Sequence, residues 1–281
     1  MFNRKETILD EHKKRRKEKI LEASFILLGI VLLLSIYELI AYLTDYKVLP
    51  ELFKSFEAMF IEMGKTKTWV YLGYSLLRLL ITLAIVTVLG YLIGLLASYY
   101  KPLELVLKPI IYILTSIPTI TIILIVVIYT KITSYVIVSL VTFPIIYKAS
   151  LNGGKMVYEK YKDIMNLEGG KSMNNFSKVL SPLTLPYIFM GLSQASALGL
   201  KVELTAEVFI STNTFKGLGS LINLAYINGD FEIMIGLTIL AVIFMSLIEL
   251  LIYLLKTFLN NKFGIEEVKT FHVRFKEEKE N

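Results

Sequence analysis

Four ionisable side chains lie within otherwise apolar stretches of the chain. They are Arg78, Lys201, Glu203 and Glu207. Their types could form ion pairs with one another or bind a charged solute. Because a charge in lipid is costly, such residues are functional candidates by default. Glu203 and Glu207 are four residues apart and share one helix face, so their repulsion requires a nearby cation or a retained proton. The cluster is expected either to line a polar path, with Glu207 as the better candidate, or to form an interhelical ion pair, the more suitable role for Arg78.

Other kinds of chemistry find little support in the residues. The chain has no Cys, so it has neither a thiolate nucleophile nor a Cys-based metal site. Its two histidines, His12 and His272, lie in charged terminal segments, which disfavours acid–base or metal chemistry in the apolar part. The triplet Gly170-Lys171-Ser172 is similar to the end of a P-loop, but Met165 stands where the first glycine is required. We therefore expect no enzyme, no nucleotide site and no bound cofactor in this chain.

The apolar stretches predict an all-α, polytopic membrane protein. Hydrophobic residues make up 55% of the 281, and the mean hydropathy is +0.62. A helical span needs about twenty apolar residues, and six stretches qualify: 20–43, 70–99, 103–129, 134–151, 187–210 and 233–255. The third contains Pro109 and Pro118, which are expected to kink or break its helix.

The distribution of Lys and Arg predicts the orientation. If the N-terminus is cytoplasmic, most of the 30 basic residues fall on the cytoplasmic side, including those of the loop after the fourth span. The positive-inside rule therefore places both termini in the cytoplasm. The predicted organisation is a basic N-terminus (1–19), a six-span domain (20–258) with a cytoplasmic loop (152–185), and a charged tail (259–281). The net charge of +6 does not indicate nucleic-acid binding.

The cytoplasmic loop is long, charged and glycine-rich, and its pattern predicts a docking element. Within residues 152–181, the segment 158–168 has helical spacing, and Gly169-Gly170 permits a sharp turn before a second helix. One stripe of the first helix holds Tyr158, Tyr161, Met165 and Glu168. Such a helix suits a groove in a soluble partner. An ordinary solvated loop with a glycine turn is the alternative.

Outside the spans, residues 50–63 form an apolar stripe that predicts an amphipathic helix on the outer side. This helix and residues 211–231 are candidate contacts for an extracytoplasmic protein. Small residues recur every four positions at Gly90 and Gly94, and at Gly191, Ala195 and Gly199. They predict close helix packing within the subunit rather than a dimer seam.

An ordered set of motifs resembles the permease subunit of bacterial ATP-binding-cassette importers, in the branch for nitrate, sulfonate, taurine and thiamine precursors. The loop of that family has Glu-Ala-Ala, three residues, Gly, and later Leu-Pro. Here the matching positions are Asp163, Gly169, Ser181-Pro182 and the repeat Leu185-Pro186; the other matches are Ser75 to Arg78, Gly90 to Gly94, Ser116 to Pro118, Lys201, Ala206-Glu207 and Gly217 to Gly219. The resemblance covers roughly residues 47–258. It departs from the family at Ile164 and Met165, which replace the two alanines.

The resemblance implies a multi-pass protein of the bacterial inner membrane that works in a complex. The partners would be a second copy of the chain, two ATPase subunits, and an extracytoplasmic solute-binding protein. ATP and Mg would bind the ATPases. The candidate coupling residues are Tyr158, Tyr161, Asp163, Met165, Glu168 and Gly169. Arg78, Lys201, Glu203 and Glu207 would line the path between two copies or pair with one another.

Two other classes of protein and two classes of solute stay open. An ion-coupled secondary transporter could use Glu203 and Glu207, although no internal repeat supports it. An intramembrane enzyme would need a nucleophile or a set of metal ligands, and the sequence offers no Cys and no His within the spans. Intramembrane Arg and Lys suit a small anion such as a sulfonate, taurine or nitrate, whereas the 17 Tyr and 16 Phe suit a vitamin precursor such as thiamine pyrimidine.

Overall fold

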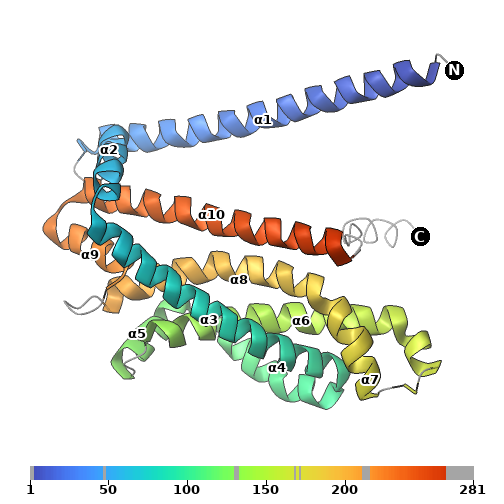
Figure 1. The fold of residues 1–281 in the computed structure, drawn as a ribbon. Helices are drawn as coiled ribbons and strands as arrows, with labels where there is room; N and C mark the ends of the chain where they lie inside the picture. Colours follow the sequence, from blue (N-terminus) through green and yellow to red (C-terminus); the bar gives the residue numbers. More distant parts are fainter. Residues whose placement is uncertain are drawn as a thin grey trace.

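The computed structural model describes residues 3–46, 49–129, 133–167, 169–170, 172–210 and 216–263, and all regular elements within them are helical (Figure 1). The predicted all-α fold is confirmed. In chain order the helices are α1 (Asn3–Leu43), α2 (Leu52–Met63), α3 (Thr66–Tyr99), α4 (Lys101–Ser116), α5 (Thr119–Tyr129), α6 (Thr133–Leu167), α7 (Met173–Asn175), the π-helix η1 (Phe176–Leu180), α8 (Ser181–Ile210), α9 (Leu218–Asn228) and α10 (Phe231–Phe263).

Five helical segments of the described chain are long and apolar enough to cross a membrane. They are Leu21–Leu43, Thr66–Tyr99, Ser134–Leu167, Met173–Ile210 and Phe231–Leu255. Helices α4 and α5 qualify only as a pair, bent by 96° at the break around Pro118. The six predicted spans are therefore found if the bent pair counts as one. Pro118 breaks the helix as predicted, whereas Pro109 lies inside a continuous α4.

The stretch predicted as a loop after residue 151 is mostly helix, which corrects the predicted boundary of the fourth span. Helix α6 continues without interruption to Leu167, because Gly153 and Gly154 serve close packing instead of breaking the helix. A Cβ at Gly153 would lie 2.6 Å from Cβ of Tyr187, and one at Gly154 would collide with Ser98. The predicted order of helix, Gly-Gly turn and second helix is found, but its first helix is an extension of α6.

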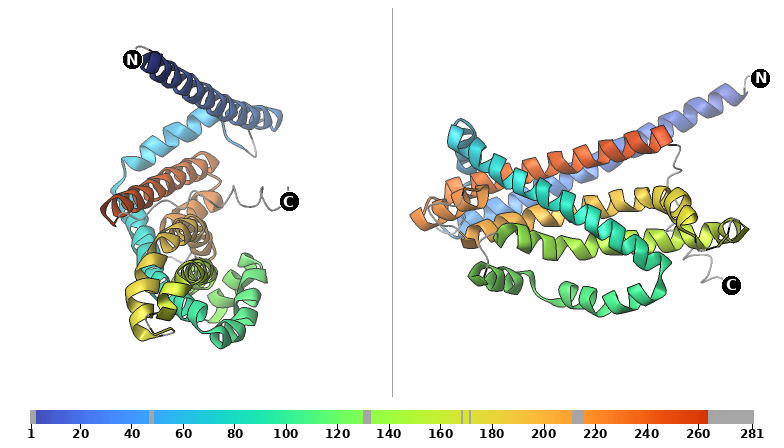
Figure 2. Two further views of the ribbon diagram at one scale, coloured as in Figure 1. Left: turned by 90° about the vertical axis from the view of Figure 1, so that its right-hand side faces the viewer. Right: turned by 60° about the horizontal axis from the view of Figure 1, so that its bottom comes forward.

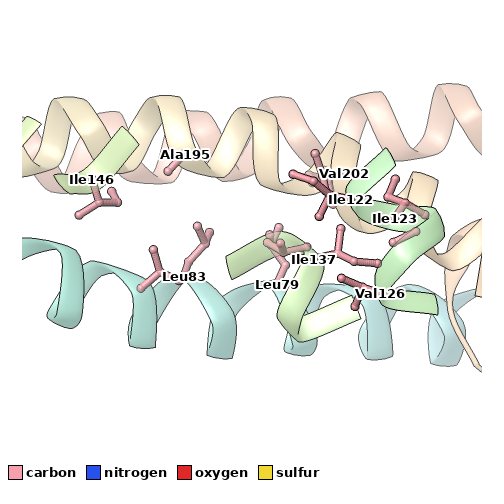
Figure 3. Packing of buried hydrophobic residues seen from close by; sticks show 13 residues of the cluster. Leu79, Leu83, Ile122, Ile123, Val126, Ile137, Ile146, Ala195 and Val202 are labelled. Atoms are coloured by element: carbon pink, nitrogen blue, oxygen red, sulfur yellow. The ribbon is translucent and has the colours of Figure 1, made fainter. Parts of the chain in front are cut away.

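The main hydrophobic core lies where α3, α5, α6 and α8 meet. Leu79 and Leu83 of α3 pack with Ile137 of α6, and Ile123 of α5 joins the same cluster (Figure 3). The small residues serve these contacts as predicted. A Cβ at Gly90 would lie 2.9 Å from Ile146, one at Gly94 2.6 Å from the carbonyl of Tyr147, and one at Gly191 2.5 Å from the Cβ of Ala149, whereas Gly199 is less confined, with its nearest neighbour at 3.1 Å. The packing of α6 on α3 and α8 thus fixes the frame of the bundle.

Helix α1 leaves this frame and stands apart from it (Figures 1 and 2). Only 6% of its apolar window is buried. It is joined to the rest near α2, where the Tyr37 hydroxyl donates to the carbonyl of Pro50 at 3.0 Å and the backbone N–H of Leu52 donates to Glu38 at 3.2 Å. The predicted amphipathic helix is present as α2, which packs its inner face on α10.

Candidate functional site

Three of the four predicted intramembrane charges form one buried cluster. Arg78 of α3 donates from Nε to Glu203 of α8 at 2.9 Å, and from Nη2 to Glu207 one helical turn further. Both carboxylates have 0% exposed area. The hydroxyl of Ser134, at the start of α6, lies 2.7 Å from Glu203, and that of Ser75 lies 2.7 Å from Glu207. Every charged group in the cluster therefore has polar partners, as a buried charge requires.

The same cluster holds the beginning of α9. Backbone N–H groups at a helix N-terminus have no partner within the helix and attract a carboxylate. The N–H of Gly219 donates to Glu207 Oε2 at 2.8 Å, and the N–H of Leu218 donates to the Ser75 hydroxyl at 2.8 Å. Arg78 also donates to the carbonyl of Lys216 at 2.8 Å. The cluster therefore connects α3, α6, α8 and the N-terminus of α9.

This contact explains two glycines whose role the sequence leaves open. A Cβ at Gly217 would collide with the carboxylate of Glu207, and one at Gly219 would lie 2.6 Å from the Cβ of Glu207. The motif Gly217-Leu218-Gly219 thus lets the backbone approach a buried carboxylate closely. Sequence reasoning placed Glu207 and these glycines in the same family pattern, but had no signal that they touch.

Lys201, the fourth predicted charge, does not belong to the cluster. It lies on the exposed face of α8, whereas Glu203 and Glu207 lie on the buried face. No carboxylate of the described chain forms a salt bridge with it, since Arg78 is the partner of both buried acids. The sequence could not separate these roles, because spacing shows which residues share a face but not which face is covered.

The second candidate site is the tip formed by the end of α6, the Gly-Gly turn, α7 and η1. Its predicted contact stripe points inward. Met165 is 1% exposed, and Tyr158 and Tyr161 pack around it with the aromatic rings of Tyr99 and Phe176. The ring centroid of Tyr99 lies 5.9 Å from that of Tyr158 and 5.6 Å from that of Phe176. These contacts stiffen the tip, while Tyr158 and Tyr161 stay partly exposed.

The turn at the tip has a defined geometry. Gly169 and Gly170 have φ values of 94° and 67°, which side chains other than glycine rarely adopt. The amide of Asn175 donates to the carbonyl of Met165 at 3.0 Å and to that of Gly170 at 2.8 Å, so it bridges the turn. The Ser172 hydroxyl accepts the N–H of Asn175 and thereby caps α7. Glu168, predicted as a contact residue, lies outside the described residues.

Three large apolar side chains are exposed at this tip. Leu167 is 88% exposed, Met173 76% and Ile164 56%. Asp163, a predicted coupling residue, is also exposed. Large apolar side chains exposed on one short element are candidates for a protein contact. The three-residue step from Ile164 to Leu167 was a signal for this surface, but the aromatic stripe beside it carried the stronger pattern.

A salt bridge fixes the base of the tip to the bent pair. Lys155 of α6 donates to Glu104 of α4 at 2.6 Å, and Lys101 donates to the same carboxylate at 3.1 Å. These cations hold Glu104 against α6 at the point where the helix leaves the bundle. The tip is therefore braced by packing against α3 on one side and by an ion pair with α4 on the other.

These helices define a polytopic membrane protein with an ordered tip at one end of its bundle. Residues 86–265 match the family model of the binding-protein-dependent transport system inner membrane component, and the chain belongs to this family. It is a permease component of an ATP-binding-cassette transporter. The match includes the tip and α8 but not α1, α2 or Arg78. No curated protein matches the chain.

Proposed function

We propose that this chain is the transmembrane permease subunit of an ATP-driven importer, and that its tip is the element on which a separate ATPase subunit acts. The observation that carries the proposal is the exposed apolar surface of the tip, made of Ile164, Leu167 and Met173. Burying such side chains is favourable by about 1.5–3 kcal/mol each. A groove in a soluble partner fits this surface, since exposed polar residues such as Lys162, Asp163 and Asn166 lie beside the apolar ones.

The tip is also suited to transmit force. Its first helix is the end of α6, so a displacement of Leu167 is transmitted along a continuous helix that extends into the core. The packing of Met165 and the Asn175 bridge oppose bending at the turn. A coupling element has to move as one body with the spans it drives, and hinge or rocking motions between packed helices are the usual result.

The remaining parts of the complex follow from the family and the predicted orientation. Two copies of the chain would enclose the solute path, two ATPase subunits would bind ATP and Mg and grip the two tips, and a solute-binding protein would deliver solute on the opposite side. The tip and both termini would be cytoplasmic, since the basic residues gather there. ATP-driven closure of the ATPases would bring the tips together and open the path outward.

An ion-coupled secondary transporter is a weaker proposal. It would need carboxylates that gain and lose ions during transport. Glu203 and Glu207 are fully buried and bonded to Arg78, and they hold the start of α9. Their contacts suit a fixed structural cluster better than a group that changes its charge state.

Co-purification tests the proposal. A tagged chain is extracted from native membranes in a mild detergent, and the ATP-binding subunit that elutes with it is quantified. Wild type is expected to retain the ATPase, whereas the double variant Ile164→Asp, Leu167→Asp is expected to lower its recovery by roughly tenfold or more, because two apolar side chains that the partner would bury are replaced by charges.

A matched variant serves as the control. Asn166→Asp adds a charge at an exposed neighbouring position without removing an apolar side chain. It is expected to retain most of the ATPase. Equal recovery from the double variant and from wild type would contradict the assignment of the tip.

A further inference from the structure

Lys201 is an exposed cation well inside a membrane-spanning helix. It lies nine residues before Ile210, the last residue of α8, which corresponds to about 14 Å along a helix. A charge at such a depth is costly in lipid and normally faces a protein interior or water. In the described chain no carboxylate neutralises it. Its surroundings therefore have to contain water or a second charged group.

The position of α8 limits what these surroundings are. Helix α8 is central in the bundle and contacts α3, α5, α6, α9 and α10; Figure 2 shows it between α6 and α10. One face stays uncovered, and from residue 190 onward it consists of Met190, Gln194, Leu198, Lys201, Thr205 and Phe209. Half of these side chains are polar, at steps of three and four residues that align them along the helix.

The outward face of α3 shows what a lipid contact looks like in the same protein. Between residues 77 and 92 its exposed side chains are all apolar: Leu77, Leu80, Ile81, Ala84, Ile85, Val88, Leu89 and Leu92. The exposed face of α8 differs from this apolar face of α3 because it carries the polar side chains of Gln194 and Lys201. Lipid is therefore the wrong neighbour for this face, whereas it suits α3.

The charges of α8 and its partner Arg78 are separated by face. The carboxylates of Glu203 and Glu207 lie on the covered side of α8 and are bonded to Arg78, so neither the acids nor the arginine lies on the open side. The open face of α8 thus has a net positive charge in each subunit. Two copies facing each other would double it.

We infer that the open face of α8 is a wall of the solute path, and that Lys201 is the residue that selects solute by charge. This deepens the proposed function and rests on it. A positive wall with hydrogen-bonding groups from Gln194 and Thr205 suits a solute with a negatively charged group, such as a sulfonate or another small oxyanion. It disfavours a basic heteroaromatic solute. Lys201 contributes attraction and orientation, while neighbouring apolar residues keep the contact weak enough for release.

The absence of Cys from the sequence allows a direct test. Single cysteines are introduced as Gln194→Cys or Thr205→Cys on α8, and as Ile85→Cys or Val88→Cys on the lipid face of α3. Membranes that contain the chain with its native partners are treated with two water-borne methanethiosulfonates, one with a sulfonate and one with a quaternary ammonium group. Rates are measured with and without a non-hydrolysable ATP analogue, so that both states of the complex are sampled.

The α8 cysteines are expected to react in at least one state, and the α3 cysteines in neither. At Thr205→Cys the sulfonate reagent should react faster than the ammonium reagent. Adding Lys201→Gln should lower the ratio of the sulfonate rate to the ammonium rate by about sixfold. This value follows for a unit positive charge about 8 Å from the cysteine in water, because the charge attracts one reagent and repels the other. Lys201→Arg should restore the ratio.

Two results would overturn the inference. Unreactive α8 cysteines would mean that Lys201 extends along a lipid or protein contact, as long basic side chains do. Reactive cysteines with a ratio independent of Lys201 would mean that the path is wet but not selected by this charge. Neither result depends on recovery of the ATPase, so failure here and failure of the proposed coupling are distinguishable.

Discussion

Replacement of Arg78 by methionine tests whether the intramembrane charges form a structural ion cluster. Methionine keeps much of the length of the side chain but removes the bonds that Arg78 donates to Glu203, to Glu207 and to the carbonyl of Lys216. Two carboxylates with 0% exposed area then lose their cation. Removing one partner of a buried ion pair costs about 3–5 kcal/mol, because the remaining charge stays buried without compensation.

This cost translates into a large thermal shift. For chains of this general size, 1 kcal/mol lowers the thermal midpoint by about 2–4 °C. The variant Arg78→Met is therefore expected to lose roughly 6–20 °C. Glu203→Gln should lower the thermal midpoint much less, since the glutamine still accepts a hydrogen bond from Arg78 and the ion pair between Arg78 and Glu207 remains.

The assay is thermal aggregation in detergent, followed by fluorescence of a fused reporter during size-exclusion chromatography. Lys201→Met is the matched control, because it also removes a cation from a span but one that is exposed. Its midpoint should stay within about 2 °C of wild type, as for an exposed substitution away from special features. An unchanged midpoint for Arg78→Met, or an equal loss for Lys201→Met, would refute the division between a buried cluster and an exposed path residue.

Two further predictions concern the tip and the helix packing. Gly169→Val places a branched side chain at φ 94° with no atom nearby to collide with, so its cost is backbone strain of about 1–2 kcal/mol. Membrane insertion should be normal, while recovery of the ATPase falls several-fold. The control Gly73→Val, also in open space, should leave recovery of the ATPase unchanged. Gly191→Ala should lower the thermal midpoint by several degrees, since its Cβ would lie 2.5 Å from the Cβ of Ala149. Adding Ala149→Gly should recover most of that loss, and a double variant no more stable than Gly191→Ala would contradict the packing of α6 on α8.

Much of the fold could be predicted because the bilayer restricts it. Backbone polar groups in lipid have to be satisfied within helices, so long apolar runs define spans almost directly. Five of them qualify as spans without a sharp break, and Pro118 marks the 96° bend in the remaining one because it removes a backbone donor. The small residues at Gly90 and Gly94 likewise indicate where helices approach each other.

Other features depend on tertiary contacts that spacing does not reveal. Gly153 and Gly154 suggested a loop, but they admit Tyr187 and Ser98 against an unbroken helix. The stripe containing Tyr158 and Met165 suggested a contact face, but Met165 is buried in one cluster with Tyr99 and Tyr158 is partly buried, whereas the neighbouring Ile164 and Leu167 are exposed. A helical stripe shows which residues act together, and only the fold shows what they touch.

The charge cluster shows the same limit. The four-residue step predicted that Glu203 and Glu207 share a face, and the structure confirms it. The sequence favoured Arg78 as the ion-pair partner, but spacing alone could not exclude Lys201 from the same cluster. Arg78 takes the role because α3 packs against the buried side of α8, while Lys201 points to the uncovered side.

Site-specific photo-cross-linking from the tip tests the central claim most directly. A photoreactive phenylalanine analogue replaces Leu167, which is 88% exposed, and in a separate variant Leu250, an exposed residue of the apolar helix α10. After irradiation of native membranes, the cross-linked products are identified by mass spectrometry. The account predicts that residue 167 captures the ATP-binding subunit and that residue 250 does not. Capture of lipid alone from residue 167, or of the ATPase from residue 250 but not from 167, would contradict it.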